Sequence, residues 1–411
     1  MSVSRRHFLR QASLLGVGML GLQHYACVSG AASSSKAVVP GRKVRGYGLL
    51  KADDAGILKL PEGFSYRIIS RQGDEMTDGL LVPGKGDGMA TFTAPNGKTI
   101  IIRNHELSPE MTDLGPFGYD LSRFSKVPAE KLYDAGFGQI PSMGGTTTMV
   151  FDTRTQRVDY EFMSLAGTCR NCAGGPTPWN TWISCEETVL HKGGRIEANH
   201  GYNFEVPAQL QPKLVEPVPI KAMGRFQHEA IAVDPRSGVV YQTEDRHDSL
   251  IYRYLPDHPG KLHKGGKLQI MALVEYPGRD TRNWGDVDQE DFPIGMAQAV
   301  EWLDIDDIEN MDDTLRKRGY AKGAARFARG EGMWYANGAV FFCCTNGGRK
   351  YLGQIFRYTP SQYEGQAREA DAPGMLELFI EPNRSKLLQH CDNLTVGPDG
   401  HLVVCEDTEH P

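Results

Sequence analysis

Short runs in which apolar and polar residues alternate recur along the chain, separated by turn-forming residues. The clearest turns are Ala94-Pro95-Asn96-Gly97, Asp234 to Gly238 and Gly397 to Gly400. A period of two on both sides of such a turn is typical of a β-hairpin. The pattern predicts five hairpins, which cover residues 87–106, 172–187, 229–244, 331–346 and 392–406.

A second alternating run follows most of these hairpins and predicts a third strand. These runs are residues 147–152, 202–207, 251–256 and 355–360, with further strands expected at 267–274 and 375–380. Repeats of roughly 55–100 residues, each a small antiparallel sheet, indicate an all-β β-propeller. A β-sandwich whose spacing is coincidental is the alternative. No run for an outer strand follows the fifth hairpin, so we expect an incomplete last blade or a ring that N-terminal strands close.

Two segments interrupt the repeat, and we interpret them as insertions in a single propeller domain of residues 33–411. The first, at about 110–145, is rich in loop-forming residues. The second, at about 278–330, contains patterns that predict one helix at 293–302 and another at 312–320.

The N-terminus has the features of an export signal. Arg5 and Arg6 precede the mildly apolar stretch 12–22, which is too short to span a bilayer, and small residues follow at 29–32. We therefore interpret residues 1–32 as a twin-arginine signal peptide. It predicts a protein that the twin-arginine machinery exports to the periplasm or beyond, with no stable membrane span.

Composition narrows the class of partner. The 411 residues carry a formal charge of −6, and no basic stripe is present, so the sequence gives no reason to expect nucleic acid. We expect a monomer. Seven cysteines lie beyond Cys27, and an odd number leaves at least one thiol unpaired in an exported protein. We expect one thiolate on a metal and leave the pairing of the others open.

A residue that can bind metal opens each hairpin. The openers are Asp87, Cys172, Glu229, Glu331 and Asp392, and acidic residues close four of the hairpins at Glu106, Glu187, Glu244 and Glu406, whereas the fourth ends in Thr345-Asn346. The first and last residues of an antiparallel hairpin lie opposite each other. Sheets stacked around an axis would therefore gather these side chains in one multi-metal site.

Several motifs resemble those of the PhoX-type alkaline phosphatases. They are Gly167 to Glu187 (GTCRNCAGGPTPWNTWISCEE), Gly224 to Glu229, Phe327 to Gly332 and Leu60 to Phe64. The resemblance runs from about residue 57 to the end of the chain. It implies a six-bladed propeller that holds Fe3+ and Ca2+, with Cys172, Glu187, Glu229 and Glu331 among the ligands and Arg329 in contact with phosphate.

The leading hypothesis is a metal-dependent phosphatase that releases inorganic phosphate from small phosphorylated substrates. Its candidate ligands are Cys172, Glu187, Glu229, Glu331, Glu244, Asp392 and Glu106, and its candidate catalytic residue is Arg329. A calcium-dependent lactonase or esterase is one alternative, although a cysteine ligand argues against it. A non-catalytic propeller binding protein is the other.

Overall fold

The structure is a computed structural model that describes residues 47–285, 290–384 and 387–408. The interpreted signal peptide, residues 1–32, lies outside the described residues. The chain divides into two compact units, residues 1–71 and 72–411. The described part of the smaller unit contains one hairpin, formed by β1 (Leu50–Ala52) and β2 (Lys59–Pro61). No helix in the described residues is long and apolar enough to cross a membrane.

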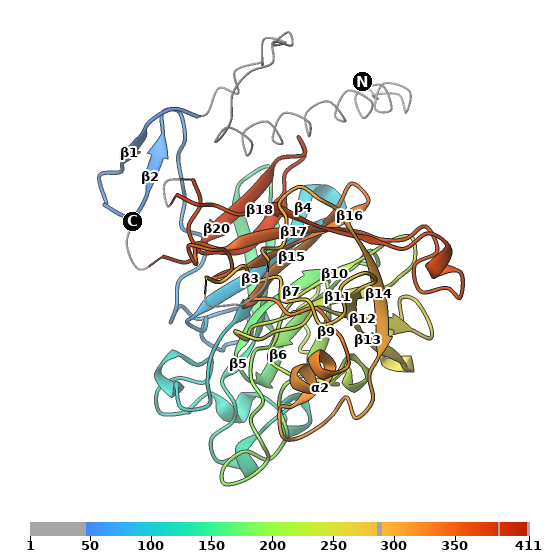
Figure 1. Ribbon diagram of the computed structural model, residues 1–411. Coiled ribbons are helices and arrows are strands. Elements are labelled where there is room, and N and C mark those ends of the chain that lie inside the picture. Colours follow the sequence, from blue (N-terminus) through green and yellow to red (C-terminus); the bar gives the residue numbers. More distant parts are fainter. Residues whose placement is uncertain (1–46, 286–289, 385–386, 409–411) are drawn as a thin grey trace. The chain divides into compact units, whose positions relative to one another are not determined.

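The larger unit is built from antiparallel strands (Figure 1). Its first sheet contains β3 (Gly86–Ala94), β4 (Lys98–His105), β5 (Gly144–Asp152) and β6 (Arg157–Thr168). Its second sheet contains β7 (Asn171–Pro176), β8 (Thr181–Glu186) and β9 (Asn203–Pro207). The third group contains β10 (His228–Val233), β11 (Val240–Glu244), β12 (Tyr252–Pro256) and β13 (Gly266–Leu273). The fourth contains β15 (Gly330–Ala336), β16 (Ala339–Cys344), β17 (Gln354–Thr359) and β18 (Met375–Ile380). The fifth contains β19 (Cys391–Val396) and β20 (Leu402–Glu406).

The helix predicted at 293–302 is wrong, because this segment contains strand β14 (Gln298–Asp304). β14 pairs with β13 along five residues and with β18 at Gln298 and Ala299, so it joins the third and fourth groups into one nine-stranded sheet. The edges of β13 and β18 supply backbone hydrogen-bond partners for β14, and this pairing outweighs the preference of its sequence for helix. The second predicted helix is present as α2 (Leu315–Ala321), the one α-helix among the described residues.

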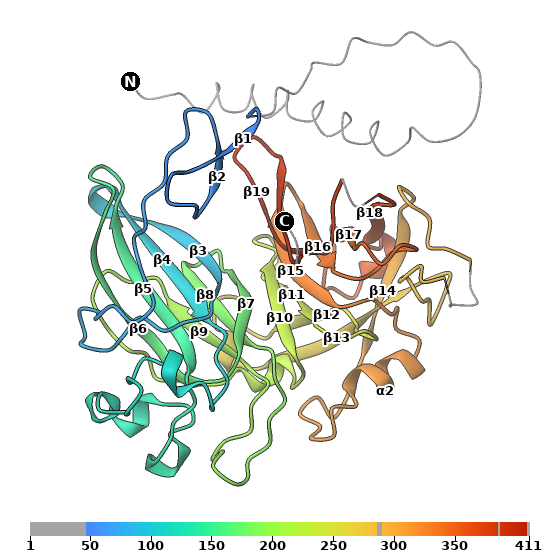
Figure 2. The ribbon, with the colours of Figure 1, turned by 90° about the vertical axis from the view of Figure 1, so that its left-hand side faces the viewer.

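The first strands of the five groups lie side by side in chain order. β3 contacts β7, β7 contacts β10, β10 contacts β15, and β15 contacts β19, as Figure 2 shows. Each group continues outward from its first strand through antiparallel neighbours. This arrangement of sheets around a common centre is that of a β-propeller, as the sequence predicts. The number of six blades stays a prediction.

Neighbouring first strands approach so closely that some positions accept no side chain. A Cβ atom on Gly88 of β3 would lie 2.8 Å from the Cα atom of Ala173 in β7. A Cβ atom on Gly332 of β15 would lie 2.6 Å from the Cα atom of Asn393 in β19. Glycine at these two positions therefore permits backbones to pack against each other near the centre.

Apolar side chains fill the space between the faces of successive sheets. Phe92 and Ile102 of the first sheet, for example, pack in one buried cluster with Trp182 and Phe204 of the second. This alternation of inward apolar positions follows the period of two in each strand. The core therefore fixes the orientation of each sheet relative to the next.

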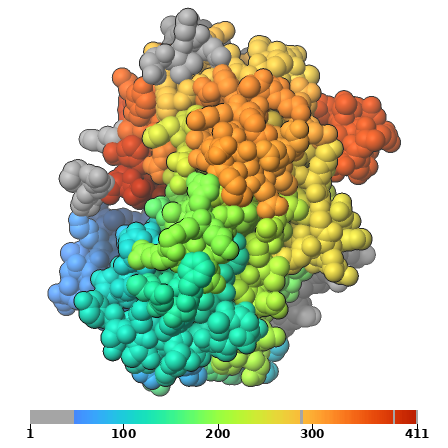
Figure 3. Space-filling model, turned by 90° about the horizontal axis from the view of Figure 1, so that it is seen from below, coloured from blue at the N-terminus to red at the C-terminus, as the bar shows by residue number. Residues whose placement is uncertain are grey.

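The long connections gather at one end of the sheets, which we call the opener end because each first strand begins there. Residues 106–143 join the end of β4 to the start of β5, and residues 274–297 join β13 to β14. Antiparallel neighbours place both ends of such a connection at the same edge. The loops of 110–145 (teal) and the segment around α2 (orange) form much of the face seen in Figure 3.

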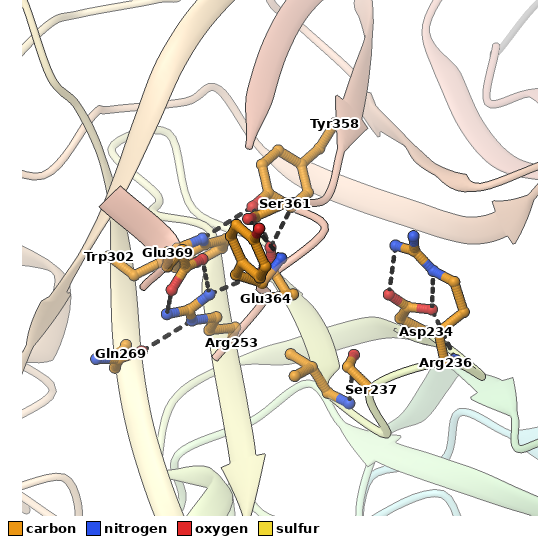
Figure 4. Close-up of polar contacts among 12 residues, drawn as sticks. Asp234, Arg236, Ser237, Arg253, Gln269, Trp302, Tyr358, Ser361, Glu364 and Glu369 are labelled. Atoms are coloured by element: carbon orange, nitrogen blue, oxygen red, sulfur yellow. Dashed lines mark hydrogen bonds and ion pairs between the residues drawn. The ribbon is translucent and has the colours of Figure 1, made fainter. Parts of the chain in front are cut away.

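A buried ion-pair network stabilises the nine-stranded sheet on its β12 side (Figure 4). The guanidinium group of Arg253 donates to Glu364 at 2.7 Å and to Glu369 at 2.5 and 2.7 Å. It also donates to Gln269 at 2.8 Å and lies 4.8 Å from the centre of the Trp302 ring. The side chains of Arg253 and Glu364 are each 2% exposed, so neither charge could be satisfied by water.

We expect Arg253→Ala to lower the free energy of unfolding by roughly 3–5 kcal/mol, because it leaves Glu364 buried without its cation. Arg154→Ala is the matched control, since Arg154 is 73% exposed and pairs with Asp152 at 3.7 Å. The control should cost less than about 1 kcal/mol. Urea unfolding of both variants measures the difference, and equal losses would contradict a stabilising role for the buried network.

Candidate metal centre

Each of the five first strands contains the same irregularity at its opener. In β3, Gly86 pairs with His105 and Met89 pairs with Arg103, so three steps on one strand match two on the other. The identical shift follows Asn171, His228, Gly330 and Cys391. One extra residue in a strand is a β-bulge, which redirects a side chain and is common beside active sites. The bulge begins in each case at the opener, Asp87, Cys172, Glu229, Glu331 or Asp392.

A backbone hydrogen bond repeated in all five hairpins identifies the residue that closes each one. The closing residue donates its N–H to the carbonyl oxygen of the residue two before the opener. The five bonds are Glu106 to Lys85, Glu187 to Arg170, Asp245 to Gln227, Thr345 to Arg329 and Asp407 to His390, at 2.9–3.3 Å. The acceptors of four of these bonds have a positive φ of 48–50°, which marks a tight turn before the strand.

This repeat changes two of the closing residues expected from the sequence. Asp245 and Asp407 occupy the position that Glu106 and Glu187 occupy in the first two hairpins, whereas Glu244 and Glu406 lie one residue earlier. A shift of one residue along a strand turns a side chain to the opposite face. Counting from the opener finds Asp407, which lies as far from Asp392 as Glu187 lies from Cys172. The same count leads to Glu244 and not to Asp245, because the turn between β10 and β11 is longer than the turn between β7 and β8.

The structure does not bring Glu244 to the centre of the propeller. Its carboxylate accepts hydrogen bonds from the Tyr252 hydroxyl at 2.8 Å and the Leu250 N–H at 3.4 Å, and it lies 3.8 Å from Arg316. Burial raises the pKa of Glu244 to about 8. These contacts belong to the packing between β11 and β12.

The other candidate ligands converge. The ligand atoms of Asp87, Glu106 and Cys172 lie within 4.8 Å of one another, and so do those of Cys172, Glu187 and Glu229. The remaining members are within electrostatic range, since Glu331 interacts with Glu229, and Asp392 interacts with Asp87 and Asp407. The acidic cluster contains Cys172 and eight carboxylates, those of Asp87, Glu106, Glu187, Glu229, Asp245, Glu331, Asp392 and Asp407.

Burial and mutual repulsion oppose ionisation in this acidic cluster. Glu229 and Glu331 are 1% and 3% exposed, and burial together with neighbouring carboxylates raises the pKa of each well above its usual value. The same causes raise the pKa of Asp87 to about 7 and that of Asp392 to about 6. Burial, then the charge of Glu229, raises the pKa of the Cys172 thiol. Like charges this close are relieved either by protonation or by cations bound between them.

Two arginines, each two residues before an opener, offset part of this charge. Arg170 bridges Glu106, at 2.8 Å, and Glu187. Arg329 donates through Nε and Nη2 to both oxygens of Asp245, at 2.8 Å each, and through Nη2 to Glu331 at 2.9 Å. Its Nη1 group has no hydrogen-bond partner among the residues that the structure describes. Arg170 was missed by the sequence analysis, although it has the same spacing to its opener as Arg329.

The donor set fits hard metal cations. Oε1 of Glu229 is buried and has no hydrogen-bond partner among the described residues, and a carboxylate oxygen of Glu229 lies within 4.8 Å of ligand atoms of Cys172 and Glu187. Carboxylate oxygens are the preferred ligands of Ca2+, and a thiolate suits a softer ion. The seven described cysteines form no disulfide, so the Cys172 thiol is free for coordination.

A buried histidine supports the end of β8, directly before Glu187. His200 lies 2.7 Å from Glu186 and 3.1 Å from Asp134, and Glu186 also accepts bonds from the N–H groups of Cys169, Gly201 and Tyr202. Burial lowers the pKa of His200, but the two carboxylates outweigh it and raise that pKa to about 9. Glu186 and Glu187 point to opposite faces, so Glu186 anchors the turn while Glu187 faces the acidic cluster.

Comparison with a solved structure also indicates an all-β propeller. The solved structure of Pseudomonas fluorescens PhoX in complex with vanadate, a transition-state analogue, matches with a TM-score of 0.59 and 17% identity. The match covers 85% of this chain and 81% of that one. At this identity the likeness supports the fold. A structure described as an oxidoreductase (glucose dehydrogenase) from Thermus thermophilus matches at a TM-score of 0.34 and 10% identity over 83% of this chain and 80% of that one, which carries no argument.

The model of the family described as alkaline phosphatase PhoX matches residues 45–411. The chain therefore belongs to the PhoX alkaline phosphatase family, and it is a phosphoric monoester hydrolase of that type. A search of curated proteins finds no match.

The raised pKa values predict how the metal-free protein responds to pH. The unfolded chain ionises Asp87 near pH 4, whereas the folded protein keeps it protonated up to about pH 7. The folded state therefore binds more protons in this range, and its free energy of unfolding falls as pH rises from about 4 to about 7. We expect calcium to reverse much of the loss, because it binds the ionised form.

Thermal unfolding at pH 5 and pH 8, with chelator and with added calcium, measures this effect. Asp87→Asn should reduce the pH dependence of the chelated protein, because the amide does not ionise. Equal stability of the chelated wild-type protein at both pH values would show that the carboxylates do not repel one another as described.

Proposed function

We propose that the protein is an exported, metal-dependent phosphatase that hydrolyses small phosphomonoesters to inorganic phosphate, with Fe3+ and Ca2+ as its cations. The observation that carries this proposal is the convergence of eight carboxylates and one thiol around Glu229, whose buried Oε1 has no partner among the described residues. Family membership supports the reaction, and the vanadate complex of the Pseudomonas fluorescens relative supports phosphoryl transfer as the chemistry of this fold.

We assign the ligands by position in the five hairpins. Cys172, Glu187, Glu229, Glu331, Asp392 and Glu106 stay candidates from the sequence, and Asp87, Asp245 and Asp407 join them. Glu244 is left out of this assignment because its carboxylate is bound to Tyr252 and lies near Arg316. Bound cations would supply charge neutralisation of the phosphoryl oxygens, which is the main demand of phosphoryl transfer.

Arg329 would orient the phosphate. Asp245 and Glu331 fix the Nε and Nη2 donors of its guanidinium group, so the direction of Nη1 is set before substrate arrives. A guanidinium held in this way matches the geometry of phosphate oxygens and needs little reorganisation. The ion pairs with Asp245 and Glu331 would also hold the guanidinium group beside the bound cations rather than in solvent.

Export to the periplasm rests on the paired Arg5 and Arg6 before an apolar stretch. The twin-arginine machinery moves folded proteins, so the acidic cluster would be assembled before or during export. We propose a monomer.

Hydrolysis of an aryl phosphate by purified protein, loaded with iron and calcium, tests the activity. We expect turnover that chelation abolishes and that the two metals restore. No turnover at full metal occupancy would refute the phosphatase, whereas turnover with calcium and no iron would refute the mixed set of cations.

We expect Cys172→Ser to lose iron and activity while the fold survives, because serine does not supply a thiolate at this position. Cys405→Ser is the matched control, since Cys405 is exposed on β20. Elemental analysis and circular dichroism of both variants provide the measurement. A Cys172→Ser protein that keeps its iron would show that the thiolate is not a ligand.

Asp245→Asn and Glu244→Gln separate the two neighbouring acids. Asp245→Asn should lower the metal content and weaken phosphate binding, because it removes a carboxylate from the acidic cluster and a partner from Arg329. Glu244→Gln should keep both properties, since the amide can accept the same hydrogen bond from Tyr252. The reverse result would place Glu244 in the metal centre.

A further inference from the structure

Three aromatic side chains lie in different loops at the opener end of the third and fourth groups of strands. His247 follows β11, Trp284 lies between β13 and β14, and Tyr351 lies between β16 and β17. Each loop starts and ends at the opener end, because the strands that it joins are antiparallel. The three rings therefore come from the same end of the sheets as the acidic cluster.

The rings form one continuous surface, which we call the aromatic platform. The ring centres of His247 and Trp284 are 6.2 Å apart, and those of Trp284 and Tyr351 are 5.7 Å apart. Tyr351 is 44% exposed, His247 is exposed, and Trp284 is half-buried. Apolar ring surface thus remains in contact with solvent at the same end of the sheets as the acidic cluster.

Polar contacts fix the aromatic platform in place. Nε1 of Trp284 donates to the carbonyl oxygen of Asn346 at 2.8 Å, and the Asn346 side chain lies 3.0 Å from Nδ1 of His247. The guanidinium group of Arg282 lies 4.0 Å from the centre of the Trp284 ring. Asp280 binds Arg282 at 2.9 and 3.1 Å, so the positive charge is already neutralised. A surface held this firmly is ordered before any ligand binds.

Backbone hydrogen bonds connect the aromatic platform to Arg329. The N–H of Arg329 donates to the carbonyl oxygen of Arg246 at 2.8 Å, and its carbonyl oxygen accepts from Thr345 at 3.0 Å. Arg246 and Thr345 directly precede His247 and Asn346. Asp245, which binds the guanidinium group of Arg329, is two residues from His247, and two residues span at most about 7 Å.

We propose that the aromatic platform binds the leaving group of the substrate and that the enzyme therefore favours phosphomonoesters of planar aromatic groups, such as aryl or nucleoside phosphates. This inference rests on the proposed phosphatase function. With the phosphate at Arg329, a group attached to the ester oxygen would lie near the loops of His247 and Asn346, because Arg329 is hydrogen-bonded to the residues that precede them.

The chemistry of the aromatic platform favours a flat ring over an alkyl chain or a charged group. Aromatic rings gain energy from stacked or edge-on contacts beyond the area that they bury. An alkyl group has no π face for such a contact. The charge of Arg282 is satisfied by Asp280, so this guanidinium group is not free to select a second anion.

Phosphonates separate binding from catalysis, because a P–C bond replaces the ester P–O bond that a phosphatase cleaves. Phenylphosphonate and methylphosphonate are titrated against the metal-loaded protein by calorimetry. We expect the variant His247→Ala/Tyr351→Ala to bind phenylphosphonate about threefold to tenfold more weakly than the wild type. Methylphosphonate and inorganic phosphate should bind the variant and the wild type equally.

Two further variants serve as controls. Tyr351→Phe keeps the ring and should retain the wild-type affinity for phenylphosphonate. Tyr119→Ala removes a ring that is 83% exposed in the 110–145 insertion and should change neither affinity. If the double variant lost affinity equally for both phosphonates, or for neither, the platform would not be the binding site of the aromatic group.

Kinetics with phenyl phosphate and glycerol phosphate test the aromatic platform and the proposed phosphatase function separately. If the wild type hydrolyses both and the double variant loses kcat/KM only for phenyl phosphate, the platform and the function are both supported. If both substrates are hydrolysed and the double variant keeps the wild-type ratio of kcat/KM for phenyl phosphate to kcat/KM for glycerol phosphate, the platform does not bind the leaving group. The proposed phosphatase function is then still supported. If neither is hydrolysed, the proposed function fails, and the phosphonate titration alone decides about the platform.

Discussion

Repulsion among buried carboxylates is the interaction on which the arrangement of this protein depends. Eight acidic side chains and one thiol converge, while two arginines lie among them. Burial prevents water from screening the charges, so the folded state keeps protons on Asp87 and Asp392 up to about pH 7 and 6. Above this range the carboxylates ionise and repel one another, and polyvalent cations bound in place of the protons would offset that repulsion. Metal binding and folding of the propeller are therefore coupled.

The β-bulge is the device that builds this centre. It occurs at the same place in all five first strands and turns each opener out of the regular alternation. The closing residue is held by a backbone bond to the turn before the opener. Close approach of the strands at Gly88 and Gly332 then draws neighbouring openers together. The same turn positions carry Arg170 and Arg329, so each repeat places a ligand and, in two of them, a counter-charge.

Much of this architecture could be predicted from the sequence, because hairpins have a local signal. Period-two runs around Gly- and Pro-containing turns identified the five hairpins, and the recurring acid or cysteine identified the openers. The exact closing residue could not be found by counting, because the turns within the hairpins differ in length: residues 177–180 separate β7 from β8, whereas residues 234–239 separate β10 from β11. Equal spacing therefore pointed to Glu244 rather than to Asp245. β14 was mistaken for a helix because its strand pairing comes from β13 and β18, which are distant in sequence. The aromatic platform combines three separate loops, and no local pattern connects His247, Trp284 and Tyr351.

Elemental analysis of the native protein, purified without chelator and freed of loosely bound ions, tests the central claim most directly. The account predicts that iron and calcium remain bound together, and that Glu229→Gln reduces both because Glu229 lies at the middle of the acidic cluster. A folded, active protein that retains no cation would contradict the account, since the two arginines of the acidic cluster offset only part of the charge of its eight carboxylates.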